Sequence, residues 1–244
     1  MRKFLALLAL ILIPSSFLLA QDATTTTSTD KMNSSATPPP PIVKPSRDFI
    51  MLQFGYNNWL TKPDSVKTKT FGFVFNGFVC YDFPIKKTKL SFATGIGVNV
   101  SVVYLDLQQL YSNDTVSGAP AIFKPDTANF KRYKVVTSYI QAPFELRYYS
   151  NTVNRNNGFK AAIGMQVGTL LGAHTKAVTS IDGTNVKYKE DTKRFISPWN
   201  FAATARIGWG NFSLFASYNL TNVFKVNDGP PITPASAGLC ITGL

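Results

Sequence analysis

Residues 89–106 read KLSFATGIGVNVSVVYLD and alternate between two kinds of side chain. The even positions, from Leu90 to Tyr104, are mostly large and apolar, and the odd positions, from Ser91 to Ser101, are small or polar. A period of two is typical of a β-strand, whose side chains point to opposite faces in turn. A glycine-rich face behind an apolar one favours a small membrane barrel, because its interior has little room for side chains and its outside meets lipid.

The same alternation recurs along the rest of the chain. It predicts eight strands, at residues 48–60, 69–83, 88–106, 131–149, 158–174, 199–210, 211–224 and 234–244. Several of these exceed the usual strand length of a soluble domain but suit a tilted strand that crosses a bilayer. We therefore expect an all-β chain.

The connections between these strands alternate in length. The second, fourth and sixth are short, at 84–87, 150–157 and 210–211, whereas the first, third, fifth and seventh are longer, at 61–68, 107–130, 175–198 and 225–233. Outer-membrane barrels have tight periplasmic turns and long external loops. The rhythm predicts an eight-stranded antiparallel up-and-down transmembrane β-barrel with both of its ends on the periplasmic side.

The segment before the first strand has a different character. Arg2 and Lys3 precede an apolar run over residues 4–13, and a cleavage site follows at Ala20, so residues 1–20 are expected to be a signal peptide. Residues 21–47 are rich in Thr, Ser and Pro and predict a disordered periplasmic tether. Residues 48–244 would form the barrel, and no later stretch is apolar enough for a membrane-spanning helix.

The chain is basic, with 25 Lys and Arg against 13 Asp and Glu and a formal net charge of +12. Loss of Arg2 and Lys3 with the signal peptide would leave 23 basic residues against 13 acidic ones, or +10. These side chains are scattered through the expected turns and loops, so we expect no nucleic-acid partner. Anionic lipid or glycolipid head groups of the outer membrane fit this distribution better.

Aromatic side chains gather near the ends of the expected strands. Those near the periplasmic turns are Tyr81, Phe83, Tyr148, Phe159, Trp209 and Phe212, and those near the outer loops are Trp59, Tyr104, Trp199 and Phe224. Two aromatic belts of this kind are expected where a barrel meets the two membrane interfaces.

Two stretches resemble a known family. Residues 138–149, SYIQAPFELRYY, and residues 206–225, which begin RIGWG and end YNLTNVFK, are similar to strand motifs of PorT-like small outer-membrane β-barrels. The similarity extends over about residues 48–244. The resemblance implies the same barrel fold in the outer membrane of a Gram-negative bacterium. It also implies a role either as an accessory of type IX protein secretion or as a porin-like protein.

Four charged residues share the inward face near the periplasmic end: Asp82, Glu145, Arg147 and Arg206. Because an eight-stranded barrel is just wide enough to be filled by its own side chains, we expect a buried charge network in the lumen. The network would plug the barrel or, alternatively, form an ion path.

Chemistry of other kinds has little support in the sequence. His174 is the single histidine, with Ser180 and Asp182 in the following loop, and a lone loop histidine is a poor candidate for a base or a ligand. We expect no catalytic, cofactor-binding or metal site. Cys80 and Cys240 lie on strands separated by a third, so free thiols are expected.

Two classes of function remain open. The barrel could be a structural or assembly partner in the envelope, touching other envelope proteins through residues 21–47 or its loops. Alternatively, it could be a surface-binding or porin-like barrel that uses its extracellular loops, chiefly 107–130 and 175–198.

Overall fold

A computed structural model describes residues 49–69, 71–111, 120–126, 130–152, 154–155, 157–181 and 184–243. The expected signal peptide, residues 1–20, and the expected tether, residues 21–47, lie outside the described residues. Within the described ranges, no helix has the length and apolarity needed to cross a membrane.

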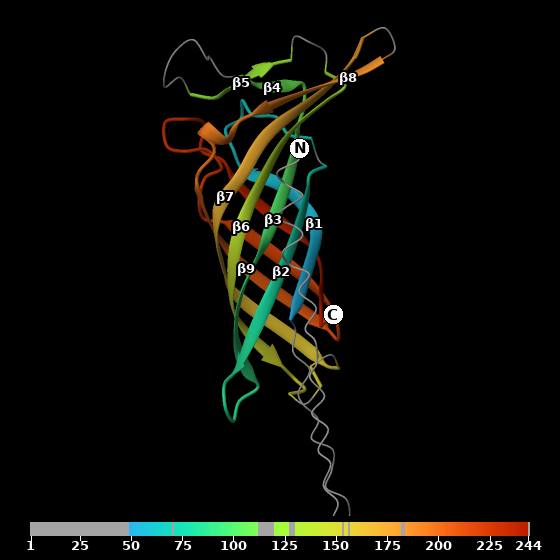
Figure 1. The fold of residues 1–244 in the computed structure, drawn as a ribbon, viewed down its shortest axis with the longest axis vertical. Coiled ribbons are helices and arrows are strands. Elements are labelled where there is room, and N and C mark those ends of the chain that lie inside the picture. Colours follow the sequence, from blue (N-terminus) through green and yellow to red (C-terminus); the bar gives the residue numbers. More distant parts are fainter. Residues whose placement is uncertain are drawn as a thin grey trace, which may run out of the picture. The chain divides into compact units, whose positions relative to one another are not determined.

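Eight antiparallel strands close into a barrel (Figure 1). They are β1 (Ile50–Thr61), β2 (Phe73–Pro84), β3 (Leu90–Leu105), β6 (Arg132–Tyr149), β7 (Phe159–Ile181), β9 (Trp199–Trp209), β10 (Phe212–Asn219) and β11 (Thr233–Thr242). Pairing runs from each strand to the next along the chain, and β11 returns to β1, with Met51 opposite Thr242. The predicted fold class is confirmed, and both barrel ends lie on the side of the short turns.

Glycine permits the closing contact between β1 and β11. Gly55 lies opposite Gly238 in the register of this pair. A Cβ atom on Gly55 would overlap the carbonyl oxygen of Ala237, and one on Gly238 would overlap that of Phe54. Only glycine lets the two backbones approach this closely, so the pairing of β1 with β11 requires glycine at both positions.

On the side of the long connections, strands extend beyond the barrel wall. β4 (Gln108–Tyr111) pairs with β5 (Ile122–Pro125), and β7 continues into a hairpin with β8 (Thr184–Asp191), which is followed by the 3-10 helix η2 (Lys193–Phe195). The connections expected at 107–130 and 175–198 therefore contain strands that were not predicted. The β8 arm is exposed to water and carries charged residues on both faces, so its sequence lacks the alternation that marks a half-buried strand, whereas Thr175 and Ala177 of the β7 arm are buried.

Bulky apolar side chains cover the outside of the barrel. Ile96, Ile163 and Leu214 are each at least 60 % exposed. Tyr81, Phe83, Trp209 and Phe212 are exposed near the short turns, and Trp199 is exposed at the other end. Trp59 and Phe224 are only 4 % and 2 % exposed, so their assignment to the outer belt was wrong. Trp59 is one of the odd-numbered residues of β1, whose side chains point into the barrel. The rings of Trp59 and Phe224 both pack in a buried hydrophobic cluster.

Candidate functional site: a filled lumen and an external sheet

The structure brings the four predicted charged residues together in the half of the lumen near the short turns. The Arg147 guanidinium lies at the centre: its Nη1 donates to Asp82 Oδ1 at 2.9 Å and its Nε donates to Glu145 Oε2 at 2.7 Å. Arg206 Nη2 donates to the same Glu145 oxygen at 2.9 Å. Strands β2, β6 and β9 supply these side chains, and none is more than 7 % exposed.

Two further residues belong to the network. Arg155 Nη1 donates to Asp82 Oδ2 at 2.5 Å, and the Tyr149 hydroxyl donates to the same oxygen at 3.0 Å. The Arg155 guanidinium also lies over the Tyr149 ring, 4.5 Å from its centroid. Sequence reasoning missed Arg155 because it lies in the turn between β6 and β7, where strand parity no longer tells which way a side chain points.

The network fills this end of the barrel. Two carboxylates and three guanidiniums share contacts, so each buried charge has an opposite charge within hydrogen-bond distance. Such paired charges tolerate burial, whereas removal of one partner leaves an uncompensated charge. The arrangement acts as a polar plug.

Amides fill the middle of the lumen. Asn76 Nδ2 donates to Gln53 Oε1 at 2.7 Å, and Asn99 donates in turn to Asn76, so side chains from β1, β2 and β3 form a chain. On the opposite wall, Gln141 Nε2 donates to Asn200 Oδ1 at 2.9 Å. The cavity between them has a volume of only about 30 Å³, which leaves room for no more than a few water molecules.

A hydrophobic cluster closes the third level, at the end with the long connections. Trp59 packs edge-on against Phe123 and Phe224, with ring centroids 5.8 and 6.3 Å away. Ile196 and Ile232 are fully enclosed in the same cluster. These side chains come from β1, β5 and the segments around η2 and β11, so the connections fold into a small core over the barrel mouth.

The family model of the outer membrane protein beta-barrel domain matches residues 47–225, well over half of the chain. The chain belongs to this family. Among solved structures, this outer-membrane barrel is similar to Ail, the attachment invasion locus protein of Yersinia pestis. Their sequences are 13 % identical, the match covers 79 % of this chain and 95 % of that one, and the TM-score is 0.33. No curated protein sequence matches this chain.

The outer-membrane barrel therefore lies in the outer membrane of a Gram-negative bacterium, with its short turns in the periplasm and its long connections outside. On the outside, β6, β7 and β8 form a sheet that extends past the wall (Figure 1). Within the described residues, β8 pairs with β7 alone, so its other edge has no strand partner. Every β8 residue except Val186 is exposed.

Aromatic rings line a hollow beside this sheet in the outer-membrane barrel. It has a volume of about 240 Å³, and its lining includes Tyr111, Phe130, Tyr133, Tyr188 and Glu190. Phe130 lies 5.8 Å from Tyr133 and 6.4 Å from Tyr188 between ring centroids. The hollow thus joins the β4–β5 region to the β7–β8 hairpin.

Three lysines and one aspartate act on His174 at the base of the hairpin. His174 lies beyond the last residue of β7 that pairs with β9, in the part that pairs with β8. Burial, together with Lys189 and Lys176, lowers the pKa of His174 below its usual value, so the imidazole is neutral at pH 7. Ser180 lies in β7, and Asp182 lies outside the described residues.

Other candidate chemistry is sparse in the outer-membrane barrel. In the ranges that the structure describes, no three His, Cys, Asp or Glu side chains are placed to hold a metal ion. Cys80 and Cys240 are buried free thiols in a cluster with Met51, Phe78 and Phe215.

Proposed function

We propose that this outer-membrane barrel is a non-enzymatic and non-conducting protein that acts by binding a partner protein at the cell surface, as a structural or assembly component of the envelope. The observation that carries the proposal is the external sheet, whose last strand, β8, pairs with no strand other than β7 among the described residues. An exposed strand edge offers backbone donors and acceptors to an extended segment of another protein.

The filled lumen supports a binding role over transport. Ion pairs, amides and a hydrophobic cluster occupy three successive levels. A solute would have to displace all three, and the cavity between them has room for no more than a few water molecules. The porin-like alternative predicts steady conductance in planar bilayers. We expect none above the leak of the bare membrane, and porin-sized steps would overturn this part of the proposal.

Charge and shape indicate the chemistry of the partner. Lys187 and Lys189 lie on β8, and Lys176 lies opposite Lys189 on β7. Glu190 and Asp191 at the end of β8 balance its two lysines, so the basic face is limited to Lys176, Lys187 and Lys189. This basic face suits an extended segment with acidic side chains. The aromatic hollow beneath Tyr188 can take an apolar or aromatic side chain of the same segment, because desolvated aromatic pockets anchor many interfaces.

In-cell photocrosslinking tests the binding role. A photoreactive phenylalanine analogue at position 188 should give a discrete adduct with a partner, whereas the same probe at the lipid-facing position 163 should not. The charge reversals Lys187→Glu and Lys189→Glu together should reduce the adduct strongly while the barrel still inserts. Equal labelling at positions 188 and 163, or no adduct at position 188, would overturn the proposal.

The similarity of residues 138–149 to a PorT-like strand supports a finer role, as an accessory of type IX protein secretion. In this role residues 21–47 would contact other envelope proteins. Deletion of residues 22–46 should then abolish export of a type IX cargo without loss of barrel insertion. Normal export from cells that lack the whole protein would exclude the secretion role and leave the surface-binding role standing.

A further inference from the structure

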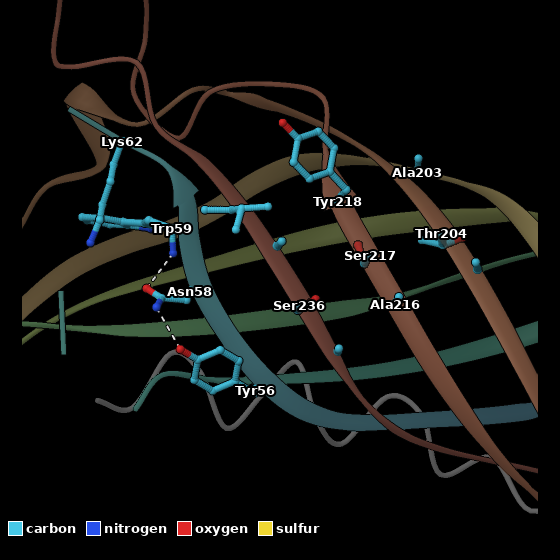
Figure 2. Close-up of a pocket in the computed structure, with 14 residues that line it drawn as sticks. Tyr56, Asn58, Trp59, Lys62, Ala203, Thr204, Ala216, Ser217, Tyr218 and Ser236 are labelled. Carbon is cyan, nitrogen blue, oxygen red and sulfur yellow. Dashed lines mark hydrogen bonds between the residues drawn. The ribbon is translucent and has the colours of Figure 1, made fainter. Parts of the chain in front are cut away.

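A groove lies on the outside of the barrel wall, over β1, β9, β10 and β11 (Figure 2). Its volume is about 720 Å³, far larger than the lumen cavity. The outward-facing part of its floor includes five alanines on three neighbouring strands: Ala205, Ala216 and Ala237 in register in one row, and Ala203 and Ala235 on either side of Tyr218 in the next.

Bulky side chains on either side of the alanine floor stand higher than the alanines, so the floor forms a hollow. On the periplasmic side, Ile207, Leu214 and Leu239 lie in register and are each more than half exposed. On the external side, Phe201 and Leu220 stand out from the wall. The small side chains therefore leave a depression about two strand spacings wide, or roughly 10 Å, in a surface that is otherwise bulky.

Polar groups gather at the external end of the groove. The Asn58 amide donates to the Tyr56 hydroxyl at 2.8 Å, and the Tyr218 hydroxyl lies 3.4 Å from Thr233 Oγ1. Lys62 lines the same end, and its ammonium donates to Thr68 Oγ1 at 2.6 Å, which leaves two further protons to donate. An amide on a lipid-facing position fits the head-group level better than the hydrocarbon.

We propose that the groove seats an anionic glycolipid of the external leaflet, with an acyl chain on the alanine floor and a phosphate group near Lys62. The position in the membrane wall favours a lipid, because hydrocarbon chains are the neighbours of this surface. The charge selects its head group: Lys62 is the only charged side chain that lines the groove within the described residues. A dry floor with a cation at the head-group end matches a phosphorylated amphiphile.

Filling the groove tests the proposal. The triple variant Ala205→Leu, Ala216→Leu and Ala237→Leu occupies the floor. Ala161→Leu is a matched control, because Ala161 is paired with Ile207 in the same wall but does not line the groove. Lys62→Gln removes the charge and keeps a donor for Thr68. A heat-dependent shift in gel mobility verifies that each variant forms a closed barrel.

Native mass spectrometry supplies the readout, with full-length mature protein and diphosphorylated lipid A as the probe. We expect one tightly retained lipid A on the unmodified protein and on Ala161→Leu. The filled variant should bind it about tenfold more weakly or worse, since loss of about two buried methylene groups corresponds to that factor. Lys62→Gln should lose the preference for diphosphorylated over dephosphorylated lipid A.

Several results would overturn the proposal. Unchanged retention of lipid A by the filled variant would place the lipid elsewhere. Equal retention of phosphatidylglycerol would show that any anionic lipid suffices. A dimer that the leucines disrupt would assign the groove to a second copy of the chain, and a partner protein that the leucines displace would assign it to a protein contact.

Discussion

Replacement of Asp82 by alanine tests how much the lumen network contributes to stability. The Asp82 carboxylate is fully enclosed and accepts hydrogen bonds from Arg147 at 2.9 Å, Arg155 at 2.5 Å and Tyr149 at 3.0 Å. Hydrogen bonds to a charged group contribute about 1.5–3 kcal/mol each. Arg147 keeps Glu145 as a partner, and water can enter the space, so the loss should be smaller than the sum, at about 3–5 kcal/mol.

Urea unfolding after refolding into lipid vesicles, followed by tryptophan fluorescence, measures this change in the free energy of unfolding. Asp106→Ala is the matched control, because Asp106 pairs with Lys69 at 4.0 Å and both side chains are 47 % exposed. An exposed pair of this kind contributes about 0–1 kcal/mol. Asp82→Asn keeps an acceptor but loses the charge, so it should fall between the two.

Equal destabilisation by Asp82→Ala and Asp106→Ala would show that the buried network contributes no more than an exposed ion pair. Stabilisation of the barrel by Asp82→Ala would show that desolvation of the network costs more than its ion pairs contribute. A double variant, Asp82→Ala with Arg155→Ala, removes the charge that is left unpaired. It should recover part of the loss if the uncompensated Arg155 is the main cause.

Three other predictions concern separate parts of the molecule. Phe224→Ala should destabilise the external hydrophobic cluster by about 3–5 kcal/mol. Protease should then cleave the loops faster on intact cells, while the barrel keeps its heat-dependent gel shift. Unchanged cleavage would contradict the role of the cluster. Gly238→Val should abolish the heat-dependent gel shift, because a Cβ atom at this position would overlap the carbonyl oxygen of Phe54. A normal shift would show that the β1–β11 pairing tolerates a side chain there. Without reductant, a maleimide should label both Cys80 and Cys240 in the unfolded chain and neither of them in the folded barrel. If the unfolded chain is not labelled, the two cysteines form a disulfide.

Much of the wall could be predicted from local patterns. Residues 89–106 alternate because one face of β3 meets lipid and the other meets a crowded interior, and that constraint applies to each residue separately. The same parity placed Asp82, Glu145, Arg147 and Arg206 on the inner face. The lengths of the connections then distinguished the periplasmic end from the external end.

Features that depend on contacts between distant segments could not be predicted in this way. Arg155 reaches Asp82 from a turn, where no periodicity fixes the direction of a side chain. Strand β8 is exposed on both faces, so its residues carry no apolar alternation. The aromatic rings of Trp59 and Phe224 meet in a core that exists only once the external connections have folded over the mouth.

The sequence by itself determined the eight strands of the barrel wall and their facing, because burial against lipid or lumen acts on one residue at a time along a strand. Only the tertiary structure decided what the faces form together. Five alanines from three strands make a groove because the register brings them into adjacent rows. Ion pairs likewise depend on the distance between strands that are far apart in the sequence.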